Sequence, residues 1–110
     1  MLSAMRAFLI GVIVLAIWAP AAAAGTCHIT QKRSISGTVK TSIKFVNKTH
    51  GAVQLYWLDY TGHLVYYGTL AAGASATQVT FKTAAWLMLN GNYSCVGYVV
   101  TPKPTYVITP

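Results

Sequence analysis

The feature that most constrains the fold is a series of short apolar segments between Ile43 and Trp86, separated by turn residues at close spacing. Short runs rich in β-branched and aromatic residues, bounded by Gly, Asn or Asp, are typical of small antiparallel sandwiches and barrels. The sequence therefore predicts an all-β protein, a small antiparallel β-sandwich of about seven strands. The expected strands are residues 42–46, 53–59, 64–67, 77–82, 86–89 and 94–100, with a short edge strand at 106–108.

Alternation along these segments predicts which side chains face the core. Both faces of the segment 53–59 are apolar, which favours a central position in a sheet. In the segment 77–82 we expect Val79 and Phe81 to point inward and Thr80 to point outward. An outward threonine at this position suits contact with a ligand.

Residues 1–24 have the pattern of a secretory signal peptide. Arg6 precedes an apolar run at residues 8–19, and Pro20 is followed by the small residues 21–24. A membrane anchor is the alternative, but the apolar run is shorter than the ~20 residues that a membrane-spanning helix needs. We therefore expect the protein to be exported, to a periplasmic or extracellular location.

The rest of the chain predicts a polar N-terminal arm at residues 25–41, tied down at one end, and one β domain at residues 42–110. So small a domain buries a limited core. Cys27 and Cys95 are the only two cysteines, and in an oxidising compartment a disulfide between them is expected. Two buried free thiols are the alternative.

The charge of the chain is strongly unbalanced. The chain has eight Lys and Arg residues and a single acidic residue, Asp59, which gives a formal net charge of +7. Such a surface favours anionic partners. The basic residues are scattered, however, so we expect no specific nucleic-acid binding. A weak contact with anionic surfaces remains open, and so does a basic surface that only keeps the protein soluble.

The composition gives little support for catalysis. A single carboxylate side chain excludes acid–base chemistry by a carboxylate pair. His28, His50 and His63 lie in separate segments without metal-ligand spacing, and no glycine-rich phosphate loop is present. We therefore expect no enzyme activity, no metal and no cofactor.

Several short motifs follow one another at fixed spacing across residues 42–100. They are Phe45-Val46-Asn47, Val53-x-x-x-Trp57-Leu58-x-Tyr60-x-Gly62, Tyr67-x-Thr69-Leu70-x-x-Gly73, Thr80-Phe81 and Trp86-Leu87. This ordered set resembles the von Hippel–Lindau β-domain family, including its stand-alone, exported members of bacterial type.

The resemblance implies a peptide-binding sandwich in which an aromatic-walled pocket captures a hydroxylated proline in an extended segment. By position, the aromatic walls fall on Trp57, Tyr67 and Trp86, and the pocket hydroxyl falls on Thr80. The family's pocket histidine falls on Ala84, whose side chain makes no hydrogen bond. A site that lacks a partner for the substrate hydroxyl loses most of its discrimination, so the expected ligand is proline or another apolar ring.

In the tumour suppressor itself, a helical domain recruits a ubiquitin-ligase scaffold; we expect no such scaffold as a partner of this exported chain. On pattern alone, Trp57 shares its strand face with Val53 and Leu55, which favours a core residue over a pocket wall. The expected function is an exported, non-catalytic module that binds a protein or peptide, with Pro-containing extended segments as the hypothesised target. The alternative is a cationic protein that binds anionic envelope lipid or polysaccharide.

Overall fold

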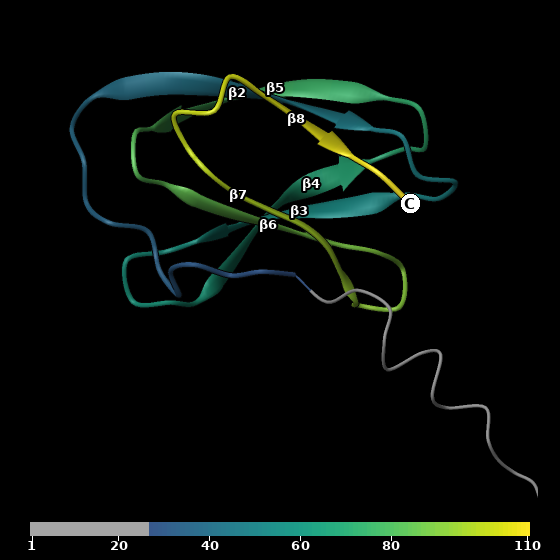
Figure 1. Cartoon of the computed structure of the whole chain (residues 1–110), viewed down its shortest axis with the longest axis horizontal. Helices are drawn as coiled ribbons and strands as arrows, with labels where there is room; N and C mark the ends of the chain where they lie inside the picture. The colour runs from purple at the N-terminus through teal and green to yellow at the C-terminus, as the bar shows by residue number, and fades with distance from the viewer. Residues whose placement is uncertain (1–26) are drawn as a thin grey trace, which may run out of the picture.

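The computed structural model describes residues 27–110, which form two β-sheets packed face to face (Figure 1). A three-stranded sheet has the order β5-β2-β8, and a four-stranded sheet has the order β4-β3-β6-β7. The predicted all-β sandwich of about seven strands is confirmed. Residues 27–110 contain no helix long and apolar enough to cross a membrane. The predicted signal peptide lies outside the described residues.

Each strand lies on a segment that the sequence predicted. The strands are β2 (Lys40–Asn47), β3 (Val53–Leu58), β4 (Leu64–Leu70), β5 (Ser75–Phe81), β6 (Ala85–Leu89), β7 (Cys95–Val100) and β8 (Thr105–Ile108). β3 is central in its sheet, and β8 is an edge strand, as expected. One pairing differs from the antiparallel expectation, because β8 runs parallel to β2. The chain changes sheets between β7 and β8, so β8 meets β2 in the same direction.

The core lies between the two sheets. Ile43 and Phe45 of β2 are fully buried and pack against Val53, Trp86 and Met88 of the four-stranded sheet. A second, smaller cluster around Leu58, Ala85 and Leu87 lies on the outer face of that sheet. Both faces of the four-stranded sheet are therefore apolar, and its outer face needs a cover.

The N-terminal arm provides this cover. In Figure 1 the blue segment after residue 27 runs along the four-stranded sheet on the side away from β2, then turns back to reach β2. The Gln31 backbone exchanges two hydrogen bonds with the Tyr98 hydroxyl, at 3.1 and 2.8 Å. Ser34 is fully buried near the ends of β3 and β6. The expectation of an arm tied at one end is wrong. The disulfide of Cys27 holds the beginning of the arm, and the hydrogen bonds of Ser34 hold it a second time.

The predicted disulfide joins Cys27 to Cys95, which are separated by 68 positions. It fixes the beginning of the described chain to the first residue of β7. Closing a loop of this length in the unfolded chain corresponds to about 4 kcal/mol of stability in the loop-entropy account. For a domain with so limited a core, this contribution is large.

Asn47 closes the end of the sandwich where β2 ends and β3 begins. Its buried side-chain amide donates to the backbone oxygens of Gly51, Leu70 and Ala71 at 2.9 to 3.2 Å. Its side-chain oxygen accepts from the Thr49 backbone N–H and hydroxyl. The Asn47 amide thus ties together the turns after β2 and β4.

Candidate functional site

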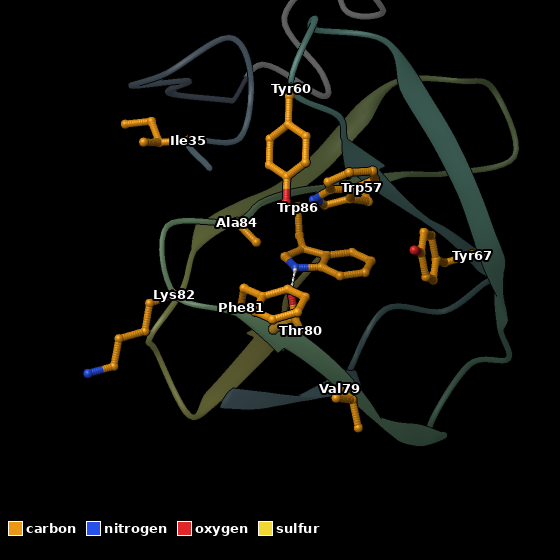
Figure 2. Close-up of a pocket in the computed structure, with 10 residues that line it drawn as sticks. All are labelled: Ile35, Trp57, Tyr60, Tyr67, Val79, Thr80, Phe81, Lys82, Ala84 and Trp86. Atoms are coloured by element: carbon orange, nitrogen blue, oxygen red, sulfur yellow. Dashed lines mark hydrogen bonds between the residues drawn. The ribbon is translucent and has the colours of Figure 1, made fainter. Parts of the chain in front are cut away.

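A pocket of ≈ 130 Å³ opens between the two sheets, on the side where β4 and β5 are the edge strands. Its lining is Ile35, Trp57, Tyr60, Tyr67, Val79, Thr80, Phe81, Lys82, Ala84 and Trp86. All four residues that the family resemblance singled out, Trp57, Tyr67, Thr80 and Trp86, line this one pocket (Figure 2). Three aromatic rings from three different strands therefore converge on one cavity. Whether a ligand binds there stays a prediction.

Trp86 forms the floor of the pocket. It lies on β6 in the centre of its sheet and is only 2% exposed. Its indole packs edge-on against Phe45 and Tyr67, with ring centroids 5.6 and 4.9 Å apart. Its indole N–H donates to the Thr80 hydroxyl at 3.3 Å, as Figure 2 shows. Packing and this hydrogen bond fix the position of the Trp86 indole at the floor.

Tyr67 reaches the pocket through a β-bulge. Leu55 pairs with Gly68 and the next residue of β3, Tyr56, pairs with Tyr66, so Tyr67 is an extra residue on β4. Regular alternation would place Tyr67 on the outer face with Thr69. The bulge reverses that parity, and Gly68 adopts a φ of 140°, which favours glycine. The Tyr67 ring thus lies against Trp86 while remaining 47% exposed.

Trp57 forms the opposite wall. It is half-buried, packs against the main core and meets the ring of Tyr60 edge-on at 5.2 Å. The two interpretations of this residue are therefore compatible, because one side of the indole contacts the core and another lines the pocket. Tyr60 comes from the turn between β3 and β4, where Gly62 takes a positive φ of 92°.

The predicted orientation of β5 is wrong. Thr80 is buried, whereas Val79 is 67% exposed and Phe81 lies on the surface. The cause is the register with β2, in which Thr41 pairs with Thr80 and Lys40 pairs with Phe81. Paired residues share a face of the sheet, so Phe81 lies with Lys40 on the outer face. The Thr80 hydroxyl reaches the pocket from the inner face instead.

Sequence reasoning did not find five of the lining side chains: Ile35, Tyr60, Val79, Phe81 and Lys82. Ile35 is an isolated apolar residue in a polar arm, and its backbone N–H donates to Thr83 O at 3.1 Å beside the pocket. An aromatic residue inside a turn, as Tyr60 is, was the clearest signal available. Ala84 lines the pocket as expected and contributes only a methyl group.

Asp59, the one acidic residue, organises the turn next to Tyr60. Its carboxylate accepts hydrogen bonds from the backbone N–H groups of Thr61 and His63, at 2.9 and 2.8 Å, and from the Thr61 hydroxyl. The His63 backbone N–H is the main cause that lowers the pKa of Asp59, with Thr61 contributing. The Asp59, Thr61 and His63 side chains are thus explained by turn structure.

A second hollow lies at the other end of the sandwich, in the region of the turns after β2 and β6. It is wider, ≈ 700 Å³, and its lining includes the small or polar residues Thr49, Gly51, Asn90 and Asn92 and no aromatic side chain. Within residues 27–110 there is no group of three or more His, Cys, Asp or Glu residues that could hold a metal ion. The aromatic pocket is therefore the better candidate site.

The family model of the VHL beta domain matches residues 32–107, which is more than half of the chain. The match spans all seven strands except the last residue of β8, and all the pocket residues. A search of curated proteins found no match. The chain therefore belongs to the VHL beta domain family.

Proposed function

We propose that this protein binds an extended segment of a partner protein by enclosing one apolar ring, proline above all, between Trp57, Tyr67 and Trp86. The observation that carries the proposal is the convergence of these three rings on one pocket. No bond is made or broken in this function. The protein acts as a binding module.

VHL beta domains are a family of protein-binding modules that bind substrates without catalysing a reaction. The family role supports a protein partner in general. The choice of a proline-containing segment rests on the lining of this pocket, in which nine of the ten residues carry no charge and the aromatic rings predominate.

The size of the pocket fits one small ring. An apolar cavity of about 150 Å³ accommodates benzene, and this pocket measures ≈ 130 Å³. The Thr80 hydroxyl accepts from Trp86, and its own proton is available to a ligand oxygen. Because Ala84 offers no second hydrogen-bonding group, we propose that hydroxylated and ordinary proline bind with similar affinity.

Export is part of the proposal. The disulfide supports it, because such bonds persist in oxidising compartments. The signal-peptide pattern of residues 1–24 is the other support. A periplasmic or extracellular partner follows from this assignment.

The experiment is calorimetric titration of the protein with a short synthetic peptide that has a central proline. We expect Trp57→Ala and Tyr67→Ala each to weaken binding about tenfold or more, since aromatic residues in a closed pocket dominate such interfaces. Tyr66→Ala is the matched control, because Tyr66 is the neighbouring exposed tyrosine and its ring packs on Tyr56, on the outer face. If Trp57→Ala and Tyr67→Ala are folded and bind the peptide as tightly as Tyr66→Ala does, the pocket is not the binding site.

The cationic alternative is tested with vesicles that contain an anionic phospholipid. Binding that survives Trp57→Ala and disappears between low and physiological salt would favour surface charge over the pocket. Binding of the proline peptide that depends on the rings and varies little with salt would favour the pocket.

A further inference from the structure

The outer face of β5 carries apolar side chains that the core does not use. Val79 is 67% exposed and Phe81 is also exposed, yet both line the pocket. They form its lip, beside the edge of the three-stranded sheet. Exposed apolar groups around a cavity are typical of a surface that a partner covers.

Two lysines flank this lip. Lys82 follows Phe81 directly and lines the pocket, and in Figure 2 its side chain extends away from the rings toward solvent. Lys40 pairs with Phe81 across β2 and β5, so its side chain shares the outer face with that ring. One lysine therefore lines the pocket, and a second lies on the same sheet face as Phe81, the residue paired with it.

No carboxylate of the described chain neutralises these lysines. Within residues 27–110, Asp59 is the only acidic side chain, and its only ion-pair contact is with His63, at 3.8 Å. Its hydrogen bonds hold it in the turn after β3. The positive charge at the pocket entrance is thus available to a ligand.

We infer that the bound segment carries carboxylate side chains next to its apolar ring, where Lys82 and Lys40 receive them. This inference rests on the proposed function and specifies its ligand as an acidic, proline-containing peptide segment. Successive residues of an extended segment are about 3.3 Å apart. A carboxylate one or two residues from the ring therefore lies within reach of a lysine at the lip.

The expected gain in affinity is modest. Exposed ion pairs contribute little individually and are screened by salt. Their main effect is on the association rate and on the choice between partners. For two lysines we expect roughly a three- to tenfold preference for an acidic peptide over a neutral one at low salt.

The test compares two peptides with the same central proline, one flanked by aspartates and the other by asparagines. Both are titrated into the wild-type protein, Lys82→Glu, Lys40→Glu and Lys48→Glu. Lys48 is the matched control, because it follows the far end of β2, ~26 Å from Lys40 at the rise of an extended strand. All three variants change the net charge equally.

We expect the wild type and Lys48→Glu to prefer the acidic peptide, and Lys82→Glu and Lys40→Glu to lose that preference. Equal affinity of the wild type for the two peptides, with binding still dependent on Trp57, would overturn this inference and leave the proposed function standing. An equal loss of preference in Lys48→Glu would overturn it too, since net charge alone would then explain the effect. If the wild type binds neither peptide, the proposed function fails as well.

Discussion

Ser34 shows how much one small side chain contributes to this fold. Its hydroxyl donates to Leu58 O and accepts from the Ala85 backbone N–H at 2.8 Å, and its own N–H donates to the oxygens of Leu58 and Asp59. Leu58 and Ala85 are the last pair of the β3–β6 ladder. The serine therefore completes the hydrogen bonding of two strands where they separate, and it holds the arm against the sheet.

Replacing Ser34 by alanine leaves the buried N–H of Ala85 without its acceptor. We expect a loss of about 1–3 kcal/mol in the free energy of unfolding, which is the usual cost of an unsatisfied buried donor. Chemical denaturation measures it. Ser36→Ala is the control, since Ser36 is exposed in the same arm. Equal stability of the two variants would contradict the role assigned to Ser34.

The sequence offers no way to find Ser34, because a serine in a polar segment looks the same whether it is buried or exposed. The aromatic residues are different. The spacing of the family pattern predicts Trp57, Tyr67 and Trp86 as pocket residues, and the structure brings the three together. Residues that occupy fixed positions of a family pattern can be predicted from the sequence, whereas a residue that acts through one buried hydrogen bond cannot.

Among the elements, β4 and β5 decide the shape of the pocket. Both are edge strands, and in both the face that a residue occupies depends on register. Alternation predicts which residues share a face but not which face is inside, and a shift of one residue reverses every assignment. For β5 the apolar Val79 and Phe81 made the wrong face look like the core face. For β4 the bulge at Tyr67 has no sequence signal other than the glycine after it.

Gly68 tests the role of the bulge. We expect Gly68→Ala to destabilise the protein by about 1–3 kcal/mol, since its φ of 140° is unfavourable for a residue with a Cβ atom. We also expect weaker binding of the proline peptide although Tyr67 is still present, because the ring would no longer be aimed at Trp86. Denaturation and calorimetric titration measure the two effects.

The control for this substitution is Gly51→Ala. A Cβ atom at either glycine would meet nothing within 4 Å, but only Gly68 has a positive φ. A difference between the two variants therefore reports backbone conformation and not crowding. If Gly68→Ala binds the peptide as the wild type does, the bulge does not position Tyr67.

At the scale of the whole molecule, the two ends of the sandwich differ in structure. One end is closed by the amide of Asn47, and its hollow has no aromatic lining. At the other end β3 and β5 finish, the arm crosses, and the aromatic pocket opens beside Tyr60.

The strand count, the central place of β3 and the disulfide could be predicted from local pattern and composition. The parallel pairing of β8 and the path of the arm could not, since both depend on contacts between residues far apart in the sequence.

The most direct test of the pocket is a nuclear magnetic resonance titration of isotope-labelled protein with the proline peptide. We expect the indole N–H signals of Trp57 and Trp86 to shift and saturate together. Signals of Asn90 and Asn92, at the opposite end, should stay in place. Saturable binding that leaves both indole signals unmoved, or shifts spread over the surface lysines alone, would contradict ligand capture by the three rings.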